Sequence, residues 1–208
     1  MIKPPPLDPQ VRREIQRKAI HLSFIVLPLT LVRGFLPWPR TRGQWTLVLA
    51  IAVLVAIALD LARLHERRFR KFFGRFFGEL IRHHEQSGLL GSTYLLLAAL
   101  LAVGLFPRPI AAAAIGYTVL GDGLAAIFGR AYGGTRYFGK SLEGSLGGLL
   151  GCLAWAAYLV ATGQLAAPIA ITGALVASLV EFLPIPLDDN LGITLFSGYA
   201  MRLLWLPI

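Results

Sequence analysis

Long apolar runs alternate with short polar connections along almost the entire chain. A helix that crosses a bilayer needs about 20 mostly apolar residues, and seven runs approach that length. These runs cover residues 19–36, 45–61, 89–106, 110–128, 145–160, 166–183 and 191–206. The pattern predicts an all-α integral membrane protein with about seven transmembrane helices.

The segment between residues 63 and 85 follows a different pattern, in which apolar residues recur at helical spacing and cations occupy the other side. The apolar stripe consists of Phe69, Phe72, Phe73, Phe76, Phe77, Leu80 and Ile81, and the cations are Arg67, Arg68, Arg70, Lys71, Arg75 and Arg82. This pattern is typical of an amphipathic helix that lies in the membrane interface. A coiled-coil partner could use the same stripe, but the neighbouring spans favour the lipid surface.

The first 18 residues differ from the rest of the chain. Residues 1–18 form a proline-rich, charged tail that ends in an amphipathic helical segment. No cleavable signal peptide is apparent, because no short basic region leads directly into an apolar stretch. We therefore expect a cytoplasmic tail over residues 1–18 and a single transmembrane catalytic domain over residues 19–208.

Composition agrees with a membrane protein, since 56% of the residues are hydrophobic and 15% are charged. Soluble domains carry roughly a quarter charged residues. The net charge of +9 resides in the connections between apolar runs, which favours anionic lipids and phosphate substrates over nucleic acid as partners. The single cysteine, Cys152, excludes a disulfide framework and a cysteine-based metal site.

Charge asymmetry predicts the orientation. With seven spans, the tail and the connections 63–88, 129–144 and 184–190 share one side, which carries 15 of the 20 Lys and Arg residues. The positive-inside rule makes that side cytoplasmic, as in a prokaryotic inner (plasma) membrane. His21 and three carboxylates, Asp60, Asp122 and Glu181, then lie near this face. Ionisable groups at membrane depth are costly and by default mark function.

Two of these polar groups also have simpler explanations. Asp60 is interpreted as structural, because Arg63 follows it at the three-residue spacing that lets two helical side chains pair. For Arg17 and Lys18 two interpretations stay open: they anchor the first span at the lipid head groups, or they contact a substrate.

The remaining polar residues have the chemistry of phosphoryl or nucleotidyl transfer. Asp122, Asp188 and Asp189, with Glu143 or Glu181, offer the hard oxygen ligands that Mg²⁺ prefers. Cations able to hold a polyphosphate are Arg17, Lys18, Arg130, Arg136 and Lys140. In such reactions catalysis is mostly alignment and neutralisation of charge.

Residues 121–148 are dense in glycine, which lets a backbone close around an anion. Gly134 to Ser141 matches the P-loop pattern Gly-x4-Gly-Lys-Ser. A P-loop needs a preceding strand and a following helix in an α/β fold, so a P-loop fold is not expected between membrane spans. The pairs Gly144/Gly148 and Gly147/Gly151 have the spacing at which membrane helices pack closely.

The combination of these motifs resembles one known family. Gly-Asp-Gly-x5-Gly-Arg at 121–130, followed by Gly-Lys-Ser-Leu-Glu-Gly-Ser at 139–145, is similar to the CTP-dependent lipid kinases, which include dolichol kinase, phytol kinase and the yeast-type diacylglycerol kinase. It is more distantly similar to phosphatidate cytidylyltransferase. Arg-Lys-x-x-His at 17–21, and Glu181 with Asp-Asp-Asn at 188–190, resemble the family's first and last elements. The resemblance extends over residues 12–198.

The resemblance implies transfer of the γ-phosphate of CTP, with Mg²⁺, to the hydroxyl group of a membrane lipid. The implied catalytic residues are Asp122, Lys140 and His21, and the implied metal ligands are Asp122, Glu181, Asp188 and Asp189. The implied nucleotide-binding residues are Arg17, Lys18, Gly121, Gly123, Gly129, Arg130, Gly139, Ser141, Glu143, Gly144 and Asn190. Dolichol kinases usually carry many additional spans, so the phytol-kinase-like or short prokaryotic members fit this chain better.

Alternatives remain open at this point. The acceptor is an isoprenoid alcohol such as a polyprenol or phytol, or diacylglycerol. A cytidylyltransferase acting on a phospholipid such as phosphatidate would use the same groups, and a transporter or scaffold would use none of them catalytically. Membrane lipids are expected partners, and a homo-oligomer is compatible with the sequence.

Overall fold

The computed structural model describes residues 9–81 and 84–205, and this part of the chain is almost entirely helical. Its elements are α1 (Pro9–Ser23), α2 (Val26–Arg33), α3 (Arg42–His65), α4 (Arg67–Phe77), the 3-10 helices η1 (Gly78–Leu80) and η2 (His84–Gln86), α5 (Gly91–Leu105), α6 (Arg108–Tyr132), strands β1 (Arg136–Tyr137) and β2 (Lys140–Ser141), α7 (Leu142–Ala161), α8 (Ala167–Phe182) and α9 (Asp189–Trp205). The all-α expectation is confirmed.

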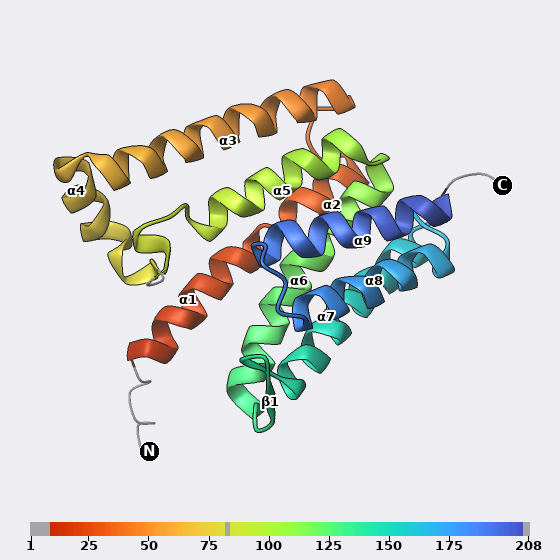
Figure 1. Cartoon of the computed structure of the whole chain (residues 1–208). Helices are drawn as coiled ribbons and strands as arrows, with labels where there is room; N and C mark the ends of the chain where they lie inside the picture. The colour runs from red at the N-terminus through yellow and green to blue at the C-terminus, as the bar shows by residue number, and fades with distance from the viewer. Residues whose placement is uncertain (1–8, 82–83, 206–208) are drawn as a thin grey trace, which may run out of the picture.

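Helix α6 is the central element of the bundle and contacts α1, α2, α5, α7, α8 and α9 (Figure 1). Its first half is buried almost completely, and residues 111–114 are all alanine. Small side chains let neighbouring helices approach α6 closely from several directions. By contrast, α3 contacts mainly α5 and α4 and lies at the edge of the bundle.

Glycines bring α6 and α7 into close contact. A Cβ atom added to Gly147 would lie 2.5 Å from the Phe128 ring, and one added to Gly148 would lie 2.9 Å from the Gly121 carbonyl oxygen. One added to Gly151 would lie 2.9 Å from the Leu120 carbonyl oxygen. The close helix packing that the glycine spacing predicts is therefore confirmed.

The predicted number of transmembrane helices is wrong. Among the described helices, α3, α6 and α7 are long and apolar enough to cross a membrane, and α5 and α8 are shorter apolar helices. The last predicted span corresponds to the 17-residue α9, and its final residue, Leu206, lies outside the described residues.

The first predicted span is interrupted. Helix α1 ends at Ser23 and α2 begins at Val26. Pro28 explains the break, because a proline ring clashes with the carbonyl group four residues earlier, here that of Phe24. Helix α2 then ends at Arg33, and the following cap residue, Gly34, adopts φ +64°.

Large apolar side chains cover the outside of the bundle. On α3, Leu47, Ile51 and Leu54 are 57%, 53% and 66% exposed, and on α7 both Leu146 and Leu150 are about 60% exposed. Exposed apolar patches of this kind mark surfaces that contact lipid or other proteins. Together with the lengths of α3, α6 and α7, they indicate association with a membrane.

The predicted boundary between tail and transmembrane domain falls inside α1, which is continuous from Pro9 to Ser23. Lys18, the last residue of the predicted tail, is buried with 3% exposure. The end of the tail therefore packs against the bundle. Residues 1–8 lie outside the described part of the chain.

The amphipathic segment is shorter than predicted. Helix α4 covers Arg67–Phe77, whereas Arg63 belongs to α3, and Arg82 lies outside the described residues. None of the residues of α4 is buried, and Phe72 and Phe76 are 61% and 64% exposed. The side chain of Arg70 donates to the carbonyl groups of Arg63 and Leu64, which fixes α4 against the end of α3.

Candidate functional site

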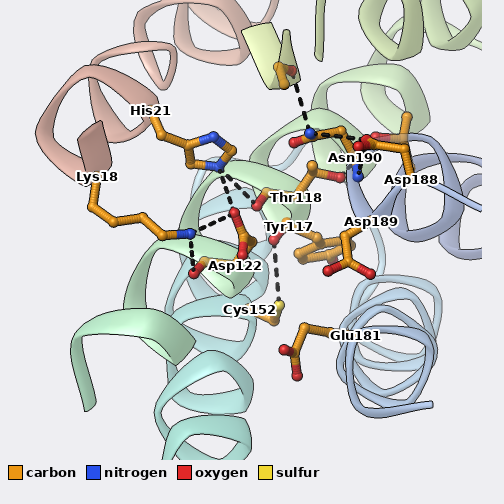
Figure 2. A network of polar contacts seen from close by, with 12 residues as sticks. Lys18, His21, Tyr117, Thr118, Asp122, Cys152, Glu181, Asp188, Asp189 and Asn190 are labelled. Carbon is orange, nitrogen blue, oxygen red and sulfur yellow. Dashed lines mark hydrogen bonds and ion pairs between the residues drawn. The ribbon is translucent and has the colours of Figure 1, made fainter. Parts of the chain in front are cut away.

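Asp122, on α6, lies at the meeting point of α1 and α6 (Figure 2). The Nζ atom of Lys18 lies 2.8 Å from Asp122 Oδ2 and donates to the backbone carbonyl of the same residue over 3.2 Å. His21 Nε2 lies 3.5 Å from the same carboxylate oxygen. The two helices fit together because Gly123 leaves room for Leu22, whose Cδ2 atom would lie 2.5 Å from an added Cβ.

Thr118, one helical turn before Asp122, connects this cluster to α9. Its hydroxyl group lies 2.7 Å from the Thr194 hydroxyl, and its carbonyl oxygen lies 3.4 Å from His21 Nε2. Both threonines are fully buried. These contacts hold the ring of His21 and the carboxylate of Asp122 in fixed positions relative to each other.

Lys140, on β2, forms the second polar cluster. Its Nζ atom donates to the carbonyl oxygen of Glu181 and lies 3.4 Å from Glu181 Oε1 and 3.3 Å from Asp189 Oδ2. Ser145, on α7, donates to Glu181 Oε2 over 3.3 Å. One cation therefore sits between two carboxylates that come from α8 and α9.

A single pocket with a volume of about 220 Å³ joins the two clusters. Its walls come from α6, the β-hairpin, α7, α8 and α9. The lining residues are Asp122, Ala125, Ala126, Gly129, Arg130, Arg136, Gly139, Lys140, Ser141, Gly144, Ser145, Glu181 and Asp189. Asp122, Glu181 and Asp189, which come from three different helices, lie around the same region in Figure 2.

The stretch that matches the P-loop pattern folds as a β-hairpin. Strand β1 pairs antiparallel with β2, and Phe138 and Gly139 form the two-residue turn with φ of 54° and 83°. Two positive φ values are characteristic of a type I′ turn. Ser141 then caps α7 by accepting a hydrogen bond from the Gly144 backbone N–H over 3.0 Å. The described residues contain no strand besides this hairpin, so the α/β context of a P-loop is absent there.

The conspicuous glycines have two different roles. Gly129 and Gly144 face each other beside Ser141 and line the pocket, as does Gly139. Gly121 and Gly123 are not among the lining residues. An added Cβ would meet Cys152 Sγ at 2.8 Å in the first case and Leu22 in the second, so these two positions are explained by helix packing.

Asp188 and Asn190 lie beside the pocket and are not among its lining residues. Asp188 precedes α9, and its Oδ1 atom accepts hydrogen bonds from the backbone and side-chain N–H groups of Asn190, both over 3.0 Å. Asp188 thus acts as an N-cap, one of the common roles of aspartate. Asn190 also donates to the Gly91 carbonyl over 3.3 Å, which ties α9 to α5.

Three further predicted nucleotide-binding residues also lie away from the pocket walls. Arg17 and Lys18 are not among the lining residues, and Lys18 instead contacts Asp122. Glu143 accepts a hydrogen bond from the Thr135 backbone over 3.3 Å and braces the hairpin. Their positions favour a supporting role over direct contact with a ligand.

Sequence analysis did not single out Ser145 as a site residue. A signal was available, because Ser145 lies in the first turn of α7, four residues after the cap residue Ser141, and this spacing brings two side chains to the same side of a helix. The structure places both in the pocket wall.

Asp60 belongs to a separate buried cluster. Its Oδ1 atom lies 3.0 Å from Arg63 Nη2, and its Oδ2 atom accepts from Thr93 Oγ1 over 2.7 Å and from the Leu90 backbone over 3.0 Å. Arg63 also donates to the backbone carbonyls of Glu85 and Gly88. The structural interpretation of Asp60 is confirmed.

The described residues of the pocket do not form a metal site from protein groups alone. Across residues 9–81 and 84–205, no three His, Cys, Asp or Glu side chains are grouped closely enough to hold a metal ion. Mg²⁺, however, typically takes one or two protein carboxylates and completes its shell with water and phosphate oxygens. Asp122, Glu181 and Asp189 supply suitable oxygen atoms in the pocket wall.

Comparisons with known proteins leave the function open. No family model matches the chain, and no solved structure matches it significantly. An uncharacterized protein of Rickettsia prowazekii (strain Madrid E) is 33% identical over 135 residues, which cover 64% of this chain and 63% of that relative. The match therefore includes less than two thirds of the relative's length and assigns no activity.

Proposed function

We propose that this protein is a membrane lipid-alcohol kinase that transfers the γ-phosphate of CTP to the hydroxyl group of an isoprenoid alcohol or diacylglycerol. The observation that carries the proposal is the pocket in which three carboxylates face three cations, Arg130, Arg136 and Lys140. Carboxylates that bind Mg²⁺ and cations that bind phosphate are the groups that phosphoryl transfer needs. The choice of CTP rests on the resemblance of residues 121–130 and 139–145 to the lipid kinase family.

The dimensions of the pocket fit the phosphate end of a nucleotide. Sites that enclose drug-sized ligands usually measure at least about 300 Å³. A volume of about 220 Å³ suits a chain of phosphate groups, with the nucleoside outside it. Arg136 and Gly139 of the exposed hairpin form part of the pocket wall.

In this proposal each polar residue has a defined task. Asp122 acts as a ligand of Mg²⁺ or as the base that accepts the proton of the lipid hydroxyl, and Lys18 and His21 hold it in place. Lys140 neutralises charge on the transferred phosphate, while Glu181 and Asp189 orient its ammonium group. Bound Mg²⁺ would offset the negative charge of the triphosphate.

The bilayer supplies the acceptor in this scheme. The exposed leucines of α7 and the apolar outer face of α8 support contact with lipid chains close to the pocket. We further propose that the pocket faces the cytoplasm and that α4 lies in the interface of the same leaflet. The exposed phenylalanines of α4 and its five cations support that position.

A transfer assay tests the proposal. Purified protein with Mg²⁺ and CTP labelled at the γ-phosphate is incubated separately with polyprenol, phytol, farnesol and diacylglycerol. We expect label in at least one extracted lipid and at least a 100-fold lower rate for Asp122→Asn. The matched control is Glu66→Gln, which changes an exposed acid at the start of α4 and keeps the wild-type rate.

The same assay, repeated with phosphatidate as a further acceptor and with CTP labelled at the α-phosphate, separates the alternatives. A kinase leaves the α-phosphate in soluble CDP, whereas a cytidylyltransferase acting on phosphatidate incorporates α-label into the lipid and releases pyrophosphate. If neither label enters any of these lipids in the presence of Mg²⁺, the proposal is wrong. A transporter or scaffold predicts that outcome and also predicts that Asp122→Asn leaves its function intact.

A further inference from the structure

Among the described residues, the end of the bundle opposite the candidate site carries cations and no Asp or Glu. Helices α3 and α6 begin at this end and α5 ends there, whereas the other end of α6 leads to the candidate site (Figure 1). The sequence has no Asp or Glu between residues 15 and 59 or between residues 86 and 121. Three arginines, Arg40, Arg42 and Arg108, nevertheless lie in these stretches and gather in the structure.

These three arginines surround a second pocket of about 80 Å³. It lies between the end of α2, the first residues of α3 and α6, and the end of α5. Val103 and Phe106 of α5 form its apolar wall together with Trp45 of α3. The pocket therefore combines charged groups at its margin with apolar side chains inside.

Backbone carbonyl groups hold the guanidinium groups in place. Arg42 donates to Val103 O over 2.9 Å and to the Gly104 carbonyl, Arg108 donates to the Leu31 carbonyl, and Arg40 donates to Pro37 O over 2.8 Å. Carbonyl groups fix the arginines without neutralising them. Because a guanidinium group has five N–H donors, each arginine keeps donors for a further acceptor.

Trp45 provides an independent observation. Its side chain lines the pocket and is only 5% exposed, yet its Nε1–H group has no acceptor among residues 9–81 and 84–205. Buried polar groups nearly always have a hydrogen-bond partner, and an exception calls for an unseen water or ion. The first turns of α3 and α6 add two positive helix-dipole ends at the same place.

Every polar side chain that lines this pocket is thus a hydrogen-bond donor or a positive charge. We propose that it binds a phosphate group, either in the head group of an anionic phospholipid or as a free phosphate ion. The arginine fork matches the geometry of phosphate oxygens, and basic pockets between membrane helices bind anionic head groups. This site is separate from the kinase pocket and does not depend on the proposed activity.

Thermal unfolding of the full-length protein tests this proposal. The protein is stripped of lipid in a neutral detergent, and its Tm is measured with phosphatidylglycerol, with phosphatidylcholine and with inorganic phosphate. A ligand that binds only the folded protein raises Tm, so we expect phosphatidylglycerol to raise it by about 3 °C or more and phosphatidylcholine to leave it unchanged.

Two substitutions test whether the increase in Tm comes from binding at this pocket. Arg40→Gln removes a charge whose described hydrogen bond is to a loop carbonyl, and Trp45→Phe removes the indole N–H while keeping an aromatic ring. Each substitution should reduce the increase in Tm with phosphatidylglycerol by at least half. The matched control is Arg33→Gln, at the same end of the bundle, because Arg33 donates to the Tyr158 hydroxyl over 2.8 Å and does not line the pocket.

The outcomes separate the two sources of phosphate. A shift with phosphatidylglycerol alone identifies a lipid site, and a shift with inorganic phosphate as well identifies recognition of the phosphate group itself. Both support the proposal if Arg40→Gln and Trp45→Phe reduce the shift and Arg33→Gln does not. No shift with either compound, or an equal shift in all variants, overturns it.

Discussion

The ammonium group of Lys18 lies 2.8 Å from the carboxylate of Asp122, and 104 residues of chain separate the two. The side chain of Lys18 is 4% exposed and that of Asp122 is 20% exposed, so water screens the pair only partly. Lys18 also donates to the Asp122 carbonyl, which fixes both its distance and its direction. We infer that Lys18 positions Asp122 and does not itself contact a substrate.

A double-mutant cycle tests this relationship. Lys18→Gln and Asp122→Asn each remove one member of the pair, and the double variant removes both. Because each single change leaves a buried or half-buried partner without its counter-charge, we expect a coupling energy of about 1–3 kcal/mol in the free energy of unfolding. The measurement is reversible unfolding in detergent. Additive effects of the two substitutions would contradict the ion pair.

The buried cluster around Asp60 should matter for stability and not for chemistry. Asp60→Asn leaves Arg63, which is 4% exposed, without its charge partner, and we expect a loss of about 3–5 kcal/mol in the free energy of unfolding. Denaturant titration gives that loss, and turnover per folded molecule should stay within a few-fold of wild type. The control Glu66→Gln, at an exposed position, should cost less than about 1 kcal/mol. A selective loss of turnover would assign Asp60 to the active site.

Because α6 packs closely on α7, we expect one methyl group added between these helices to destabilise the protein. Gly148→Ala would place a Cβ 2.9 Å from the Gly121 carbonyl oxygen, and a backbone atom cannot move away cheaply. We expect a loss of about 1–3 kcal/mol in the free energy of unfolding.

The matched control for this substitution is Gly104→Ala on α5, where no atom lies within 4 Å of the added Cβ. Alanine should stabilise that position by about 0.5–1 kcal/mol, because it restricts the unfolded chain more than glycine does. Thermal unfolding of both variants gives the comparison. Equal effects would show that α6 and α7 are not in close contact.

The position of α4 is accessible to spin labelling, because Cys152 is the sole cysteine of the chain and is buried. In a Cys152→Ser background, a label at Phe76→Cys should be more accessible to oxygen than to a water-soluble nickel complex. A label at Lys71→Cys, on the cationic side of the helix, should show the reverse. Equal water accessibility at both positions in liposomes would place α4 in solution and not in the interface.

The sequence predicts helices reliably here because apolar runs of sufficient length leave few other options in a membrane. Helix ends are harder to predict. Pro28 interrupts the first apolar run, and the 15 residues of α5 and 16 residues of α8 are shorter than a typical span. Hydropathy alone predicts each of these runs as a complete span.

The gathering of polar residues could be predicted from chain direction, since alternating spans bring Asp122, Lys140 and Asp189 to the same end of the bundle. The structure brings these three residues into one pocket. Their neighbours could not be predicted, because contacts such as Lys18 with Asp122 depend on how α1 crosses α6.

The sequence also does not show which of several similar residues lines the pocket and which has a structural role. Asp188 and Asp189 are adjacent and have the same chemistry, yet one caps α9 and the other faces Lys140. Likewise Gly129 and Gly139 line the pocket, whereas Gly121 faces Cys152. A difference of a few ångströms in helix packing decides such assignments.

Equilibrium binding of CTP to the purified protein, measured by calorimetry with and without Mg²⁺, tests the shared pocket directly. We expect Mg²⁺-dependent binding that Lys140→Gln and Asp189→Asn each weaken at least tenfold, while Lys71→Gln on α4 leaves it unchanged. Absence of binding, or equal binding by all four proteins, would contradict the claim that these residues share one metal and phosphate pocket.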